Sequence, residues 1–132
     1  MKGQKVFGLI TFPTSRDIYI EVDGRRLAAA QSYKAKSTQD SRSVEAFGSS
    51  EPVGTVGGKV RHLLELTRVR LLDPAGQDFY GLDDFNVVIV KPDRKIIYSG
   101  CRWLSIDETV NLGDPVYETL SLVACRRLEV GL

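Results

Sequence analysis

The sequence is poor in the residues that most often carry out catalysis, with one histidine and two cysteines among 132 residues. The single histidine, His62, lies in a predicted strand, and no Ser, Cys or acidic pattern near it suggests a nucleophile and its base. One His and two distant Cys also lack the ligand spacing of a zinc site. We therefore expect no enzymatic activity, no catalytic, cofactor or metal-binding residues, and no cofactor.

The two cysteines, Cys101 and Cys125, lie 24 positions apart in segments that both resemble strands. A Cys-x-x-Cys pair for redox or metal chemistry is missing. The interpretation is a pair of buried thiols, because this spacing does not by itself imply a disulfide.

An excess of charge of one sign and a long apolar run are also missing. The formal net charge of +1 gives no reason to expect a polyanion as the main partner, because duplex-binding domains concentrate Lys and Arg. No apolar stretch approaches the roughly 20 residues of a membrane helix. The run Val6–Phe12 follows Lys2 and Lys5 as in a short signal peptide, but Pro13 interrupts it. We interpret residues 1–15 as an N-terminal docking segment or leading strand, with no membrane partner.

The charges that are present are unevenly distributed along the chain. Residues 25–72 hold nine Lys or Arg against four Asp or Glu, a balance of +5, whereas residues 73–132 hold six against ten, a balance of −4. If the two halves form different surfaces, identical subunits attract one another head to tail. The alternative is that the charges mix on the folded surface.

Alternating apolar and polar residues predict strands along most of the chain. Ile18, Ile20 and Val22 alternate with polar residues before an Asp23-Gly24 turn. The returning strand is expected over about 26–36, although Ala28–Ala30 also suits a helix. Further strands are expected over 60–72, 85–90, 95–106 and 116–126. Turns are expected at 73–76 and at Pro92-Asp93, a short helix or helical turn within 77–84, and a bulge or close backbone approach at Gly100.

These elements predict one all-β domain spanning residues 1–132, a mostly antiparallel sandwich or barrel with one short helix. The irregular stretch 41–59 stands out because it combines several glycines with apolar side chains. It is either an extended loop or hairpin, an arm that docks on a neighbouring molecule, or a loop folded back on its own domain. As an arm it predicts the following subunit-interface residues: Val44, Glu45, Phe47, Glu51, Pro52, Val53 and Val56.

Three other groups of residues suggest ligand sites, and each has a structural interpretation beside it. Gly54–Lys59 resembles a phosphate loop but lacks the first glycine and the hydroxyl residue after the lysine. Asp83 and Asp84, with Asp78 nearby, suit either a hard cation or a solvated acidic turn at a helix start. The aromatic residues Phe85, Tyr98 and Trp103 form either a platform for bases or sugars, or part of the core.

The order of elements resembles a known family. The hairpin opening Ile18–Arg25 is followed by a polar strand through Ser32–Lys36, a long loop through Val44–Gly48, and a late strand at Thr119–Ala124. Over about residues 15–127 this order is similar to the tail-tube proteins of phages and contractile injection particles, whose fold is shared with the hemolysin-coregulated tube protein of type VI secretion.

The resemblance implies a β-barrel or sandwich with six copies per ring, and stacked rings around a channel through which DNA or effectors pass without sequence-specific binding. It also implies that the 41–59 loop reaches a neighbouring subunit. The expected partners are further copies of the chain and other tail proteins such as sheath or baseplate. The expected location is the tail of a virion or phage-like particle assembled in the bacterial cytoplasm. A lumen-facing set of residues is not evident.

Two kinds of function follow from these observations. The first is a structural subunit of the tube, or of a baseplate ring that starts it. The alternative is a small β-barrel binding or adaptor module that recognises a protein or glycan through its loops. A metal enzyme built on Asp83 and Asp84 is the third, weaker hypothesis.

Overall fold

The structure is a computed structural model that describes residues 12, 14–71 and 77–132. Within this part of the chain, eight strands and two short 3-10 helices follow one another. In chain order they are η1 (Ser15–Asp17), β1 (Tyr19–Val22), β2 (Arg25–Arg26), β3 (Ala30–Val44), β4 (Gly54–Val69), η2 (Phe79–Gly81), β5 (Phe85–Val90), β6 (Arg94–Thr109), β7 (Tyr117–Ala124) and β8 (Arg126–Gly131).

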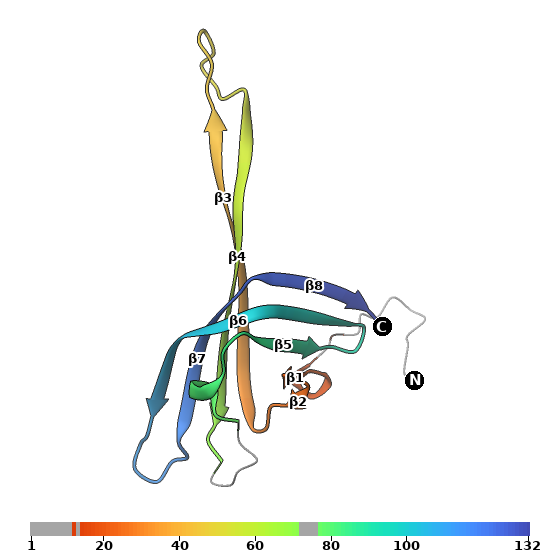
Figure 1. Cartoon of the computed structure of the whole chain (residues 1–132), viewed down its shortest axis with the longest axis vertical. Helices are drawn as coiled ribbons and strands as arrows, with labels where there is room; N and C mark the ends of the chain where they lie inside the picture. The colour runs from red at the N-terminus through yellow and green to blue at the C-terminus, as the bar shows by residue number, and fades with distance from the viewer. Residues whose placement is uncertain (1–11, 13, 72–76) are drawn as a thin grey trace.

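The strands form two packed sheets that share the long strand β6. The first half of β6 pairs with β5 on one side and β8 on the other, and β1 and β2 extend the sheet beyond β5. The second half of β6 pairs with β7, which is followed by β4 and then β3. We call these the five-stranded sheet and the four-stranded sheet. All described pairings are antiparallel, and the strand path does not close into a barrel (Figure 1).

β6 changes sheet at Gly100. This glycine has a φ of +65°, and a Cβ added to it would lie 3.0 Å from both Cβ and Sγ of Cys125. The register between β5 and β6 shifts at the same place, so β6 carries the bulge predicted there. Only glycine combines this backbone conformation with such a close approach.

The core lies between the two sheets and consists of the inward-facing positions of each strand. β7 alternates half-buried and buried residues along its whole length, as a strand with one core face must. Phe79 of η2 packs edge to face on Phe85, with ring centroids 5.9 Å apart. Further core members are Ile20, Val22, Leu27, Leu64, Leu66, Val87, Ile89, Ile96, Tyr98, Leu120 and Leu122.

A buried ion pair interrupts this apolar core. Arg68 and Glu118 are each only 2% exposed, and the Arg68 Nε donates to Glu118 Oε1 at 3.0 Å. The Arg68 guanidinium also lies 4.8 Å from the centre of the Phe79 ring and donates to the Gln77 carbonyl. Gln77 in turn donates to the Val22 carbonyl at 3.1 Å. The pair therefore connects the four-stranded sheet, the segment before η2 and the five-stranded sheet.

The all-β, mostly antiparallel class with an extended hairpin is confirmed, and the helical segment is the 3-10 turn η2. The returning strand predicted over 26–36 is wrong at its start, and so is the helical alternative. Ala29 has a φ of +57°, and this conformation turns the chain out of the five-stranded sheet between β2 and β3. The prediction of two buried thiols is also wrong, because Cys101 is buried but Cys125 is exposed. Burial raises the pKa of Cys101 to about 11, which keeps this thiol protonated and unreactive.

The predicted docking segment 1–15 falls mostly outside the described residues, as does the turn expected at 73–76. Neither of the two described helices is long and apolar enough to cross a membrane.

Candidate assembly surfaces

An arm formed by β3 and β4 projects far beyond the two sheets (Figure 1). Ladder pairing continues from Ala30 and Arg68 in the body to Val44 and Gly54 near the tip, with a register shift after Gln39. At this shift a Cβ on Gly58 would lie 2.8 Å from the Asp40 carbonyl oxygen. Glycine at position 58 thus allows the two strands to stay close. This is a structural reason for a glycine in Gly54–Lys59, the segment that superficially resembles a phosphate loop.

The seven residues predicted for the arm lie together on its outer part. Val44 ends β3, Val56 lies in β4, and the other five belong to the tip between the strands. All seven are exposed, and the Phe47 side chain is fully so. Most of 41–59 is therefore a regular hairpin, although the sequence favoured an irregular stretch. Its role in subunit contacts stays a prediction.

The four-stranded sheet has two free edges in the described part of the chain. The outer edge of β3 has no strand beside it, and neither does the β6 segment Arg102–Thr109 on the side away from β7. Because every neighbouring pair is antiparallel, β3 and β6 run in opposite directions. Free edges of this kind are templates for pairing with another chain.

The face of the four-stranded sheet that points away from the core is mainly polar. Ladder partners place its side chains in rows that cross all four strands. One row contains Lys34, Glu65, Ser121 and Ser105, the next contains Ser32, Thr67, Thr119 and Asp107, and a third contains Lys36, Leu63, Val123 and Arg102. The hydroxyls of Thr67 and Thr119 are 3.3 Å apart. This face was not predictable from local sequence patterns, because its members come from four separate segments.

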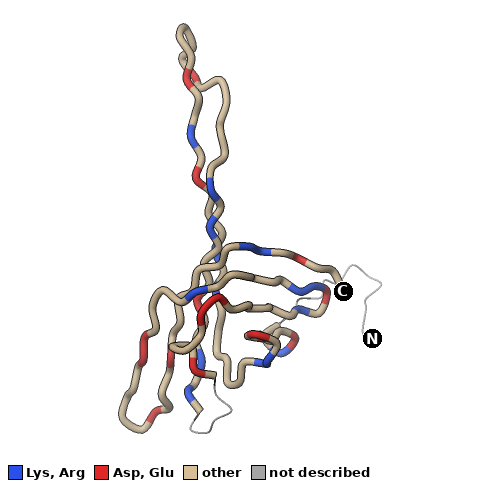
Figure 2. The backbone as a smooth tube through the Cα atoms, viewed as in Figure 1, with Lys and Arg blue, Asp and Glu red and all other residues tan. Residues whose placement is uncertain are grey.

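Charge of opposite sign gathers at two distant places on the molecule. The middle and base of the arm carry mainly cations, with Glu45 and Glu51 toward its tip, whereas the end of the β6–β7 hairpin carries anions (Figure 2). The cations are Lys34, Lys36, Arg42, Lys59 and Arg61, with Asp40 3.8 Å from Arg61; the anions are Asp107, Glu108 and Asp114. Part of the charge difference between the two sequence halves thus becomes a difference between two surfaces.

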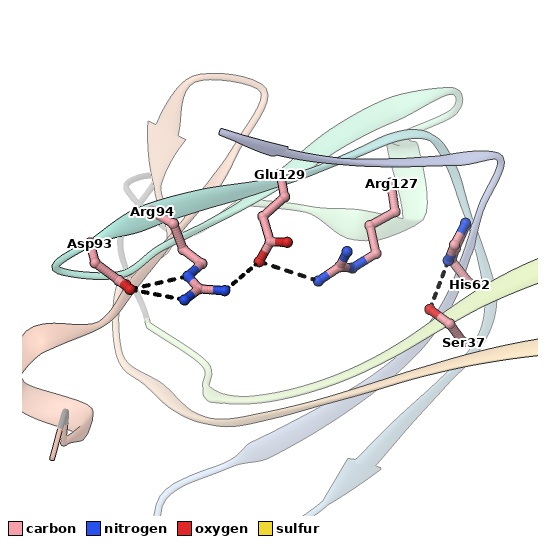
Figure 3. A network of polar contacts seen from close by, with 6 residues as sticks. All are labelled: Ser37, His62, Asp93, Arg94, Arg127 and Glu129. Carbon is pink, nitrogen blue, oxygen red and sulfur yellow. Dashed lines mark hydrogen bonds and ion pairs between the residues drawn. The ribbon is translucent and has the colours of Figure 1, made fainter. Parts of the chain in front are cut away.

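His62 lies opposite Ser37 on the β3–β4 ladder, and its Nδ1 is 2.8 Å from the Ser37 Oγ (Figure 3). No serine close to His62 in the sequence marks this contact; the neighbouring strand brings Ser37 to the imidazole. The imidazole also packs at an angle on the Tyr98 ring, with centroids 6.3 Å apart. Among the described residues no carboxylate is hydrogen bonded to this imidazole, so the contact is that of a cross-strand pair.

The acidic residues and the aromatics considered as ligand sites have structural partners. Asp83 forms an ion pair with Arg102, and Asp78 caps η2 by accepting from the Tyr80 N–H at 3.1 Å. The described residues contain no cluster of three or more His, Cys, Asp or Glu suited to a metal ion. Phe85 and Tyr98 are core residues, which leaves Trp103 as the one exposed member of the supposed platform.

A chain of ion pairs runs across the end of the five-stranded sheet (Figure 3). Arg94 contacts Asp93 at 3.0 Å and Glu129 at 2.8 Å, and Arg127 lies 3.8 Å from Glu129. The hydrogen bonds from Arg94 hold the pKa of Asp93 and that of Glu129 below their ordinary values. These contacts link the β5–β6 turn to β8.

Arg94→Ala is expected to lower the melting temperature at pH 7 by at most about 3 °C, because exposed ion pairs contribute little. The lowered carboxyl pKa values mean that this contribution is fully present above the unfolded pKa values of about 4, and it is lost as the pH falls through the lower folded-state values. The difference between parent and variant should therefore shrink progressively as the pH falls below about 4, as measured by circular dichroism. Arg25→Ala, which removes the same charge elsewhere, should show no such pH dependence.

No protein-family model matches the sequence, and comparison with curated protein sequences finds no significant match. Solved structures do match. The tube-terminating cap of the anti-feeding prophage aligns with a TM-score of 0.75 at 8% identity, covering 97% of each chain. The SPP1 tail tube aligns with a TM-score of 0.69 at 17% identity, covering 91% of this chain and 80% of the other. Hcp1 from Flavobacterium johnsoniae aligns with a TM-score of 0.51 at 15% identity, over 87% and 95%.

The fold is thus that of phage tail-tube proteins, as the sequence resemblance implied. At these identities the likeness shows the fold alone.

Proposed function

We propose that the protein is a structural subunit that assembles into rings, which stack as the inner tube of a phage-like tail or form the baseplate ring that starts the tube. The observation that carries this proposal is the pair of free, oppositely directed edges on the four-stranded sheet. Two different edges at opposite sides of one molecule favour a heterologous contact, which closes into a ring when the rotation allows it.

In such a ring, β3 of one copy lies antiparallel beside β6 of the next. The four-stranded sheets then join into one continuous barrel, which removes both free edges. The resemblance implies six copies. The polar face of the four-stranded sheet lines the channel, and the five-stranded sheet faces outward.

The chemistry of this face suits passive conduction. Its three rows contain the cations Lys34, Lys36 and Arg102, the anions Glu65 and Asp107, and several Ser and Thr residues. A lining of mixed charge neither holds a polyanion tightly nor presents a row of base-reading groups. DNA or an effector would therefore pass without sequence-specific binding, and the chain would act without catalysis.

The arm supplies contacts between subunits through the exposed apolar residues at its tip. Its cationic base and the anionic end of the β6–β7 hairpin provide attraction between copies. Outward-facing surfaces are available to other tail proteins such as sheath or baseplate. The expected location is the tail of a virion or phage-like particle, assembled in the bacterial cytoplasm.

The purified chain is expected to form rings or tubes. Negative-stain microscopy should show particles with a central channel, and light scattering after size exclusion should give a mass that is a multiple of 14.7 kDa, six-fold if the resemblance holds. A strictly monomeric species whose mass does not change with concentration contradicts the proposal and leaves the adaptor module as the alternative.

A further inference from the structure

We propose that neighbouring copies in the ring are held together by an aromatic knob, Tyr80 and Trp103, that fills a groove beside β3 of the next copy. This inference rests on the proposed ring and names the side chains of its lateral contact. Trp103 lies on the β6 edge of the four-stranded sheet and the groove lies beside its β3 edge, so the knob and the groove are at opposite edges of this sheet.

The groove lies where the two sheets separate, between the η1–β1 segment and the first residues of β3. Its volume is about 710 Å³, within the range of cavities that bury a large organic group. Ile18, Ile20, Leu27, Ala28 and Tyr33 supply apolar walls, and Arg26 lies at its margin. The groove therefore opens directly beside the free edge of β3.

The knob is an exposed aromatic pair held in a fixed position. The Tyr80 and Trp103 rings are 5.9 Å apart and inclined at 70°, and the two residues are 59% and 37% exposed. Phe79, which is fully buried, anchors η2 immediately before Tyr80. Rigid, amphipathic aromatics of this kind are enriched at the centres of protein interfaces.

Sheet geometry brings the knob to the groove. Trp103 is the ladder partner of Leu122, and Tyr33 is the partner of Leu66. Both partners face the core, so Trp103 and Tyr33 point to the core side of the same sheet. If β6 of one copy extends the sheet beyond β3 of the next, Trp103 arrives on the side where the groove is open.

Charge around the two surfaces favours a second copy as the occupant. Arg26 lines the groove and the exposed Arg25 precedes it, whereas the exposed Asp83 and Asp84 follow Tyr80 closely in the chain, with Asp83 paired to Arg102. The competing occupant is the segment 1–11 of the same chain, because Thr14, which lines the groove, follows it closely.

Trp103 is the only tryptophan, so its fluorescence reports directly on the knob. Assembly is expected to shift the emission to shorter wavelength and to reduce acrylamide quenching several-fold relative to monomers obtained by dilution. Rings in which Trp103 stays as accessible as in the monomer would overturn this inference and leave the proposed function intact. Absence of any ring would instead count against the proposed function.

Two complementary variants test the contact itself. Tyr80→Ala/Trp103→Ala removes the knob, and Ala28→Trp fills the groove. Each should weaken ring formation by at least about 30-fold, with circular dichroism like that of the parent. Leu128→Ala, on the exposed strand β8, is the matched control and should assemble normally.

Mixing the two variants provides a stricter test, since each retains the half that the other has lost. The mixture should form heterodimers through one intact contact, and no rings, as judged by native mass spectrometry. A mixture that stays monomeric contradicts the proposal. So does a result in which Ala28→Trp assembles normally while a chain starting at Phe12 does not, because segment 1–11 would then be the occupant.

Discussion

Glu118→Ala is expected to lower the free energy of unfolding by about 3–5 kcal/mol, because it leaves the Arg68 guanidinium charged and buried without its partner. The two side chains are each 2% exposed and joined by a 3.0 Å hydrogen bond. Arg70 lies 3.7 Å from the same carboxylate but is partly exposed, so water can replace that contact. Urea unfolding of the monomer, followed by circular dichroism at pH 7, measures the loss.

The double variant Arg68→Met/Glu118→Leu is the informative control. It removes both charges and fills the space with apolar atoms, so its loss of stability should be much smaller than that of Glu118→Ala. This result would show that the intact pair adds little net stability, because the cost of desolvating both charges offsets their attraction. The protein would be strongly destabilised only when one partner is removed. A double variant whose loss of stability equals the sum of the losses of Arg68→Met and Glu118→Leu would contradict this account.

The buried pair is a feature that the sequence contains but that apolar periodicity alone does not reveal. Glu118 has the same parity as Leu120 and Leu122, and Arg68 has the parity of Leu64 and Leu66. Two charges of opposite sign at core positions of two strands are a signal that those strands are neighbours. Apolar periodicity does not use this signal, so the pairing of β4 with β7 was not predicted.

Strands were predictable wherever one face is apolar, as in β5 and β7. β3 was harder to predict, because its outer half carries polar residues on both faces and packs against no core. There the glycines at 54, 57 and 58 suggested irregular structure, whereas Gly57 and Gly58 lie in a regular strand and allow the other arm strand to approach closely. The sheet edges could not be predicted from local patterns, because an edge is defined by the absence of a partner distant in sequence.

The knob and the groove could not be predicted for the same reason. Tyr80 and Trp103 are separated by a turn and a strand, and the groove combines η1 with β3 across 15 or more positions. The available signal in the sequence was the adjacent pair Phe79 and Tyr80. Neighbouring aromatics on one helical turn point in different directions, so one of them can be buried while the other is exposed.

Replacing the arm tip Glu45–Val53 by Asn-Gly is expected to abolish stacking into tubes while single rings still form. Val44 and Gly54 are ladder partners, so a two-residue turn can join them without changing the register of the remaining hairpin. The replacement removes five of the seven predicted interface residues, including the fully exposed Phe47. Tube length by negative-stain microscopy and particle mass by sedimentation are the measurements.

The magnitude follows from apolar burial. Phe47 alone would contribute about 2 kcal/mol when covered by a neighbour, which corresponds to about 30-fold in the dissociation constant per contact. Several arms act together on each ring, so even Phe47→Ser should shorten tubes strongly, whereas Leu128→Ser, an apolar-to-polar change on β8, should not. Tubes of normal length from the Asn-Gly variant would exclude the tip from stacking. Loss of rings as well as tubes would place the tip in the lateral contact, in competition with the edges of β3 and β6.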